Sequence, residues 1–128
     1  FVEEGLRFLT PFRTIRRYAK EDVEIGGQKM HRGDSIYLIT PLANRDEEQW
    51  KCPHAFDAER SQESTHLAFG YGPGYCVGRY VGRVEAAEAV KGILAETSMF
   101  SLDPNSPKPK WEGEMYHSVS PIHAILQR

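Results

Sequence analysis

Residues 69–78 read FGYGPGYCVG, a glycine-rich turn that presents one thiol, Cys76, directly before a segment with helical spacing. A thiolate that binds iron needs backbone close around the sulfur, N–H groups directed at it, and little bulk between the chain and a flat cofactor. Gly72 and Gly74 permit the turn, and Gly78 removes a Cβ between the following helix and a planar ring. The turn therefore indicates an axial iron ligand.

A helix is expected directly behind the thiol, over residues 78–94. Its apolar side chains recur at helical spacing: Val81, Val84, Ala87, Val90, Ile93 and Leu94. This spacing predicts a helix with one buried face. Because the helix N-terminus points at Cys76, its partial positive charge favours thiolate over thiol. Phe69, at the start of the turn, is placed to shield the sulfur from water.

The turn resembles the cysteine-ligand loop of the cytochrome P450 superfamily, F-x-x-G-x-[RH]-x-C-x-G, at every position except Gly74. The family usually has Arg or His there, which hydrogen-bonds a haem propionate, so its absence should weaken cofactor anchoring by roughly 1.5–3 kcal/mol. The resemblance implies that Cys76 is the catalytic residue and axial ligand of haem b, iron protoporphyrin IX. It also implies cofactor contacts at Phe69, Gly70, Gly72, Gly78 and Gly82.

Other family elements follow in the expected order. Glu4 and Arg7 form E-x-x-R, a spacing that places both side chains on one helical face. Residues 43–46 (ANRD) and 56–60 (FDAER) resemble the family's A-N-R-D and F-x-P-x-R stretches. In the family a buried triad joins these motifs, and the matching residues are Glu4, Arg7 and Arg60. Desolvation offsets most of the attraction between such charges, so we interpret the triad as a scaffold for the cysteine loop.

Residues 17–22 (RYAKED) resemble the family's R-x-x-x-x-D segment, whose Arg reaches a haem propionate. Arg17 is therefore the first candidate for the remaining propionate contact. If the match to the family is shifted by one residue, Arg16 would make the propionate contact instead. The alternative without a cofactor role is that Arg17 is a solvated side chain at a strand edge. Residues 66–70 (HLAFG) match a sequence common in soluble bacterial members of the family. We interpret His66 as a hydrogen-bonded structural residue.

The expected fold class is α+β and mainly helical, as in the C-terminal part of the cytochrome P450 fold. Residues 23–25 alternate between apolar and polar side chains, Gly26-Gly27 is typical of a turn, and residues 35–39 have the composition of a strand. Together these patterns predict small antiparallel hairpins. Two short strands are expected around Pro121. In the family such a terminal hairpin reaches the substrate pocket. The substrate-facing candidates are Phe12, Arg13, Thr14, Ser118 and Val119.

The length of 128 residues suits one domain with a core. The family's full architecture needs roughly three times that length, beyond the usual domain range. The resemblance runs nearly end to end, and it begins with Phe1 inside a helix of the family's C-terminal third. We therefore expect residues 1–128 to be a partial cytochrome P450 domain, with the N-terminal part and the distal helix missing. An isolated chain of this kind is expected to be inactive.

The resemblance implies a haem-thiolate monooxygenase, which inserts one atom of O₂ into a small organic substrate. Electrons would come from a ferredoxin or a flavoprotein reductase at the proximal face. A net charge of −2 and a pI near 6.2 argue against a nucleic-acid partner. No apolar run approaches a membrane span, and two cysteines fit a reducing compartment, which predicts a cytoplasmic protein. A membrane anchor upstream in a longer parent stays open.

Three alternatives remain. Two thiols and two imidazoles, from Cys52, His54, His66 and Cys76, suit zinc in kind but not in spacing. Residues 70–74 could form a phosphate loop, which would need a preceding strand and basic support. The third alternative is a non-catalytic haem-binding or degenerate module of the same family, because Gly74 replaces a propionate ligand.

Overall fold

A computed structural model describes residues 1–60, 65–113 and 115–128. Its α-helices are α1 (Val2–Phe8), α2 (Thr40–Ala43) and α3 (Arg79–Glu96), and a 3-10 turn, η1, spans Gly72–Gly74. Its strands are β1 (Thr14–Tyr18), β2 (Val23–Ile25), β3 (Gln28–Met30), β4 (Ser35–Ile39), β5 (Met99–Leu102), β6 (Trp111–Glu112), β7 (Ser118–Val119) and β8 (Ala124–Gln127). Helices and strands occupy similar shares of the described chain, so the expectation of a mainly helical protein is not confirmed.

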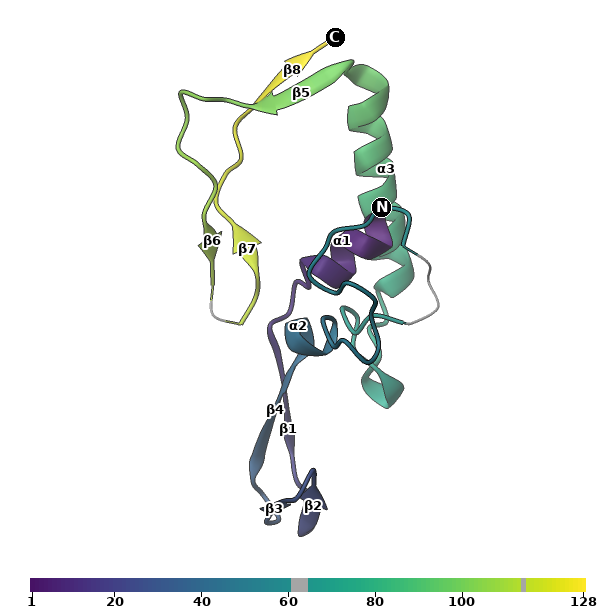
Figure 1. Ribbon diagram of the computed structural model, residues 1–128, viewed down its shortest axis with the longest axis vertical. Helices are drawn as coiled ribbons and strands as arrows, with labels where there is room; N and C mark the ends of the chain where they lie inside the picture. Colours follow the sequence, from purple (N-terminus) through teal and green to yellow (C-terminus); the bar gives the residue numbers. More distant parts are fainter. Residues whose placement is uncertain (61–64, 114) are drawn as a thin grey trace.

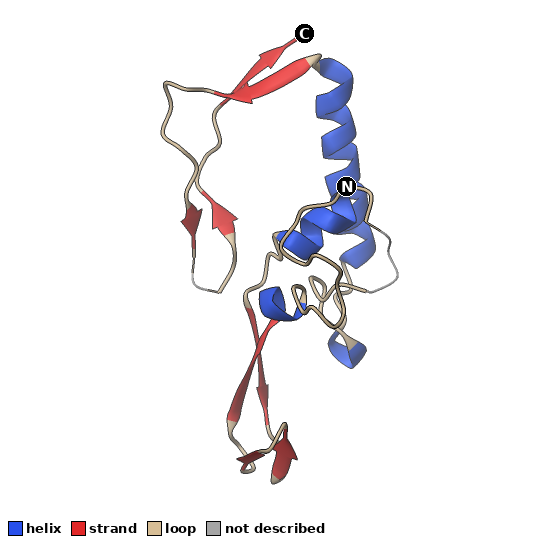
Figure 2. Cartoon of the chain, viewed as in Figure 1, coloured by secondary structure: helices blue, strands red, loops and turns tan. Residues whose placement is uncertain are grey.

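The elements spread out from a centre where α1 lies beside α3 (Figure 1). The β1–β4 ladder runs away from this centre and ends in the β2–β3 hairpin, whereas β5 to β8 extend from the far end of α3 (Figures 1 and 2). Four two-stranded antiparallel sheets result. The cysteine loop directly precedes α3 in sequence, so it lies at the end of α3 away from β5 (Figure 1).

The predicted turn at Gly26-Gly27 joins β2 to β3. The two glycines have φ values of 56° and 77°, the left-handed region that glycine enters without steric cost. Positive φ at both central residues is the feature of a type I′ turn, whose twist matches that of the strands in a two-residue hairpin. Val23 pairs with Met30 across this hairpin, and β4 pairs instead with β1, from Thr14 opposite Ile39 onward.

The tail forms strands on both sides of Pro121, as expected, but these strands do not pair with each other. The strand before it, β7, pairs with β6, and the strand after it, β8, pairs with β5. The sequence of a short strand does not show which other strand it pairs with, because pairing depends on which strands the tertiary fold brings side by side.

The helix behind the cysteine is present, and α3 runs two residues beyond the predicted end. The expected buried face is wrong for this chain: the side chains of Val81, Val84 and Leu94 are 61%, 61% and 62% exposed. The apolar spacing correctly predicted a helix, but spacing alone does not show whether any surface of the chain covers those side chains.

The buried centre is unusually polar. Among the described residues, the apolar ones that are buried are Ala19, Trp50, Pro53 and Ala68. Six polar or charged residues are buried with them: Glu4, Arg7, Thr10, Thr40, Asn44 and His66. Each of these polar side chains has a hydrogen-bond partner, since no buried side-chain nitrogen or oxygen in the described chain lacks one. The fold at the site is therefore organised by hydrogen bonds as much as by apolar contact.

Candidate functional site: the cysteine loop and its supports

The cysteine loop is a tight backbone arrangement ahead of α3. Gly70 and Gly72 have φ values of 78° and 68°, so both positions favour glycine. The Cys76 amide donates to the carbonyl of Phe69 over 2.9 Å, which closes the loop across η1. Gly78 is the residue that caps α3, and a Cβ there would lie 3.9 Å from the Cys76 sulfur. The predicted link between thiol and helix start is therefore present.

Gly74 differs from the expectation that it serves as a permissive turn position, because its φ is not in the left-handed region. A Cβ on Gly74 would instead meet the Nη2 atom of Arg17 at 3.4 Å. Glycine at this position therefore leaves room for the guanidinium of Arg17 beside the cysteine loop.

Cys76 is exposed and lies at an open pocket of about 560 Å³. This thiol pocket is lined by Pro11, Phe12, Thr14, Ile15, Arg16, Arg17, Ala68, Phe69, Gly70, Gly74, Cys76 and Met115. Its size is in the range of small-molecule and cofactor sites, and its lining is largely apolar with a few polar groups. An exposed thiol beside apolar walls and cationic side chains suits a flat, largely apolar ligand that carries anionic groups.

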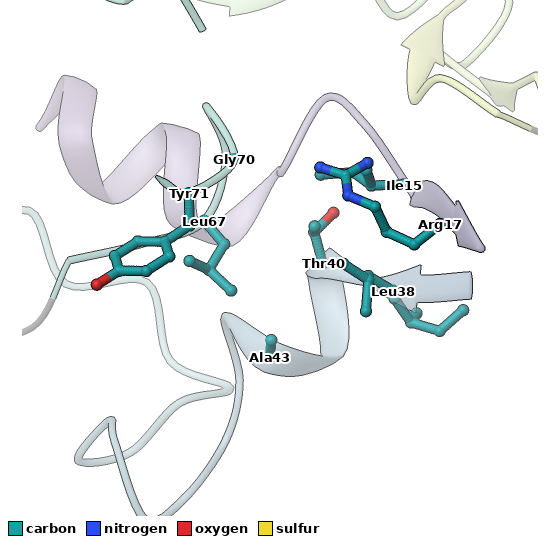
Figure 3. Close-up of a pocket in the computed structure, with 9 residues that line it drawn as sticks. Ile15, Arg17, Leu38, Thr40, Ala43, Leu67, Gly70 and Tyr71 are labelled. Atoms are coloured by element: carbon teal, nitrogen blue, oxygen red, sulfur yellow. The ribbon is translucent and has the colours of Figure 1, made fainter. Parts of the chain in front are cut away.

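A second, smaller pocket of about 340 Å³ adjoins the first and shares Arg17, Ile15 and Gly70 with it. Figure 3 shows Arg17 on the same side of this pocket as Thr40, with Tyr71 on the opposite side. The Arg17 guanidinium donates to the Arg16 carbonyl over 3.0 Å, and no ion pair holds it within the described residues. Its charge is therefore free to receive an anion.

The structure brings the three predicted triad residues together. The Arg7 Nε and Nη2 atoms each donate to a Glu4 carboxylate oxygen over 2.7 Å, and Arg60 Nε contacts both oxygens at 3.1 Å. The Arg7 and Glu4 side chains are 1% and 2% exposed. Burial alone would raise the pKa of Glu4, but hydrogen bonds from Arg7, the Asp57 amide and Arg60 outweigh it and lower the pKa to about 2.

Arg7 also holds the loop that follows α2. Its guanidinium donates to the carbonyls of Asn44, Pro53 and Ala55 at 2.8, 3.0 and 3.2 Å. It also lies 5.2 Å from the centre of the Trp50 ring. A guanidinium with five donors in a fixed fork can satisfy this many acceptors, which a lysine cannot. The triad thus fastens α1 to residues 44–60.

His66 is buried and hydrogen-bonded, which agrees with its interpretation as a structural residue. Its Nε2 atom lies 3.0 Å from the Glu3 carboxylate, and its Nδ1 accepts from the Ala68 amide over 3.2 Å. Burial lowers the pKa of His66, although the bond to Glu3 acts in the opposite direction. Sequence reasoning missed Glu3, whose only signal was its place next to Glu4.

The substrate-facing candidates separate into two groups. Phe12 and Thr14 line the thiol pocket, whereas Arg13 donates to the Gly113 carbonyl over 3.4 Å. Ser118 and Val119 lie in β7 and are not among the residues that line the pocket. The tail residue that does line it is Met115, because Phe12 forms a β-bridge with the next residue, Tyr116.

The zinc alternative is wrong for the described part of the chain, which contains no group of three or more His, Cys, Asp or Glu side chains able to hold a metal ion. His66 is instead bonded to Glu3, and the thiol of Cys52 is exposed. The phosphate-loop alternative fails as well, since residues 65–71 do not form a strand ahead of η1.

The chain belongs to the cytochrome P450 family, whose family model matches residues 1–125. It is 34% identical over 110 residues to 6-deoxyerythronolide B hydroxylase of Saccharopolyspora erythraea, covering 86% of this chain and 27% of that protein. It is 41% identical over 93 residues to 20-oxo-5-O-mycaminosyltylactone 23-monooxygenase of Streptomyces fradiae, covering 73% of this chain and 22% of that protein.

Among solved structures, the fold is similar to P450BioI in complex with a hexadec-9Z-enoic acid ligated acyl carrier protein. The TM-score is 0.89 at 29% identity, over 99% of this chain and 32% of that one. The chain thus spans about a quarter of the curated relatives and about a third of this solved structure. None of the described helices is long and apolar enough to cross a membrane.

Proposed function

We propose that residues 1–128 are the haem-binding, thiolate-bearing part of a cytochrome P450 monooxygenase, with Cys76 as the axial ligand of haem b. The observation that carries this proposal is the exposed Cys76 thiol at an open, largely apolar pocket of about 560 Å³, with its own amide bonded into the loop. Membership of the family supports the choice of haem over other flat cofactors.

The residues present fit a haem. Thiolate ligation pushes electron density onto haem iron and thereby favours O–O cleavage, which is the chemistry the cofactor supplies when bound. The chain's part would be to hold the cofactor: Cys76 would provide the sulfur, and Phe69, which lines the same pocket, would shield that sulfur from water once haem is bound. Gly70 lines the pocket, and Gly72 and Gly78 flank Cys76 in the loop, so these three glycines would keep the backbone close to the cofactor. Gly82 would contribute through the Phe69 ring, which occupies the space of its missing Cβ, and Arg17 would bind a propionate.

The whole protein would insert one atom of O₂ into a small organic substrate, with electrons from a ferredoxin or a flavoprotein reductase at the proximal face. Phe12 and Thr14, which line the pocket beside Cys76, are the substrate-facing residues with the best geometric support. Because the chain spans about a third of a solved relative, we propose that it acts as part of a longer cytoplasmic enzyme and is inactive alone.

The second candidate is a haem-binding module of the same family without catalysis. Gly74 favours it, since this position supplies no propionate-binding side chain. Turnover with a reductant and oxygen separates the two candidates: the enzyme oxidises an organic substrate, whereas the binding module keeps its haem spectrum without product. A complete absence of haem would contradict both.

Replacement of the ligand is the direct test. The haem-loaded protein, reduced and exposed to carbon monoxide, should show the long-wavelength Soret band of thiolate-ligated haem. Cys76→Ala should abolish that band, whereas Cys52→Ala, which removes the other thiol, should leave it intact. If Cys76→Ala keeps the wild-type pigment content and spectrum, the assignment of the ligand is wrong.

A further inference from the structure

An ion pair that the proposed function does not use joins the two helices next to the cysteine loop. Glu3 belongs to α1 and Arg83 to the second turn of α3. The Arg83 Nε donates to Glu3 Oε1 over 2.6 Å and Nη2 donates to Oε2 over 3.1 Å, so the guanidinium and the carboxylate meet through two parallel bonds. This paired geometry fixes the plane of the guanidinium as well as its position.

That guanidinium lies against the ring of Phe69. The Arg83 Cζ atom is 4.6 Å from the centre of the ring, within the range of a cation–π contact. The same ring also packs on the α3 backbone, because a Cβ on Gly82 would meet two of its carbons at 3.7 and 3.8 Å. The ring is therefore held by the Arg83 charge and by the bare backbone of Gly82. The carbonyl of Phe69 accepts the amide of Cys76.

His66 also bonds the Glu3 carboxylate, at the oxygen that accepts from Arg83 Nη2. Its Nδ1 accepts the Ala68 amide, so the neutral imidazole carries its proton on Nε2 and donates it to Glu3 over 3.0 Å. Glu3 thus accepts from a residue of α3 and from the segment that leads into Phe69. The Glu3 carboxylate therefore positions the Arg83 guanidinium, which contacts the Phe69 ring. It also positions His66, whose backbone segment leads into Phe69.

We propose that Glu3, Arg83 and His66 are positioning residues that hold the Phe69 ring at the thiol pocket and thereby set the environment of the Cys76 sulfur. This inference rests on the proposed function of Cys76 as the haem ligand. The competing explanation is a plain clamp between α1 and α3, in which Phe69 merely fills space. The two explanations make different predictions for a protein in which α1 and α3 are joined by another ion pair. Under the positioning proposal the group that contacts the Phe69 ring must be a cation, whereas under the clamp explanation its charge has no effect on the haem.

The experiment compares variants of the haem-loaded protein by thermal unfolding, midpoint potential and the carbon monoxide spectrum. Arg83→Gln removes the cation that contacts the Phe69 ring and breaks the ion pair with Glu3. The double variant Glu3→Arg with Arg83→Glu exchanges the two charges, so it restores attraction between α1 and α3 but places a carboxylate against the Phe69 ring. Lys91→Gln is the matched control, since it removes an exposed cation from the same helix, one that pairs with Glu88.

We expect Arg83→Gln to shift the midpoint potential of the haem. It should also lower the ratio of the thiolate-ligated carbon monoxide complex to the carbon monoxide complex without thiolate ligation by about two- to fivefold, which corresponds to the energy of a partly exposed cation–π contact. The exchanged pair should recover unfolding temperature without recovering potential or spectrum. Lys91→Gln should match the wild type in all three. Recovery of the potential and the spectrum by the exchanged pair would overturn the proposal in favour of a clamp.

A double-mutant cycle with Phe69→Leu completes the test, because a residue that acts through the ring has no further effect once the ring is gone. Arg83→Gln should change the spectrum and potential in the wild type but not in the Phe69→Leu protein. Equal changes in both backgrounds would overturn the proposal. A wild-type protein without thiolate-type haem would instead contradict the proposed function, which the cycle presupposes.

Discussion

The side-chain amide of Asn44 donates to the hydroxyl of Thr10 over 2.7 Å, and both residues are fully buried. The Asn44 Oδ1 atom accepts the amide of Leu67 over 2.7 Å, and the Thr10 hydroxyl donates to the Arg7 carbonyl over 2.8 Å. This chain of bonds runs from the end of α1 through the end of α2 to the segment that leads into the cysteine loop. Asn44 is thus the junction between the triad and the thiol pocket.

Loss of the Asn44 side chain should therefore be costly. Asn44→Ala leaves the partly buried Leu67 amide without its acceptor and removes the buried bond to Thr10, which should lower the free energy of unfolding by about 2–4 kcal/mol. Urea denaturation measures the effect. Asn105→Ala, at an exposed position, is the control and should change stability by less than about 0.5 kcal/mol. Equal stability of the two variants would mean that the Asn44 bonds contribute nothing.

The triad predicts a large cost for either of its buried partners. Glu4→Ala leaves the buried Arg7 guanidinium without its carboxylate, and Arg7→Ala leaves the buried Glu4 carboxylate with Arg60 as its one remaining guanidinium partner in the triad. Each change should destabilise the chain by about 3–5 kcal/mol and abolish haem incorporation. Arg60→Ala should cost less, because the Arg60 side chain is 9% exposed and Glu4 keeps Arg7. Full haem occupancy in both buried-site variants would show that the triad is not the scaffold of the loop.

Acid should weaken the fold through Glu4. Its folded-state pKa is about 2 against an ordinary value of 4.5, so the stabilisation is fully present above pH 4.5 and is lost as the pH falls from 4.5 toward 2. The shift is equivalent to about 3 kcal/mol at neutral pH. Urea midpoints measured between pH 7 and pH 2 should show this loss. The slope between pH 4.5 and 2 should flatten in Glu4→Gln, and an unchanged slope there would contradict the assignment.

His66 adds a separate dependence at higher pH. Burial lowers its folded pKa below the ordinary 6.5, so the folded state prefers the neutral imidazole. Its contribution to stability is therefore complete above pH 6.5 and is lost as the pH falls through the lowered pKa. His66→Gln should remove this part of the pH dependence and leave the Glu4 part in place.

The parts that sequence predicted well are those that short-range geometry determines. Gly26-Gly27 forces its turn through positive φ, and the E-x-x-R spacing places Glu4 beside Arg7 on any helix. The loop around Cys76 follows from its glycines in the same way. The expectation for Gly74 was wrong, because its importance comes from a neighbour, Arg17, that is 57 positions away in sequence.

The parts that sequence could not predict depend on long-range partners. Nothing near Glu3 indicates that it would pair with Arg83, 80 positions along the chain. The A-N-R-D resemblance drew attention to Asn44 but not to its bonds with Thr10 and Leu67. Such partners are set when the helices meet in space, and a one-dimensional pattern does not contain that information.

Gly82→Ala should stabilise α3. Replacing a helical glycine with alanine contributes about 0.5–1 kcal/mol, and the new Cβ would meet the Phe69 ring at an ordinary contact distance of 3.7 Å. Gly92→Ala in the same helix is the matched control, since a Cβ there would meet nothing within 4 Å. Thermal unfolding should show both gains, with the larger at position 82. Destabilisation by Gly82→Ala alone would mean that the ring lies closer to the helix than the structure places it.

Arg17 and Arg16 can be separated by their effect on haem affinity. Both line the thiol pocket, but Arg16 donates to the Ser35 hydroxyl over 3.1 Å and lies 4.9 Å from the centre of the Tyr18 ring. Arg17 has no such side-chain partner in the described chain and borders Gly74. Arg17→Ala should therefore weaken haem binding by about 1.5–3 kcal/mol, or roughly 10- to 150-fold, and Arg16→Ala by much less.

Haem whose propionates are esterified identifies the group that Arg17 binds. The wild type should bind this uncharged haem more weakly than haem itself, whereas Arg17→Ala should bind both equally, because no charge-assisted bond remains to be lost. Gly74→His in the Arg17→Ala background should restore part of the preference by supplying a donor from the loop. If Arg17→Ala keeps the wild-type preference, the propionate is held elsewhere, and Arg17 is the solvated strand-edge residue of the structural alternative.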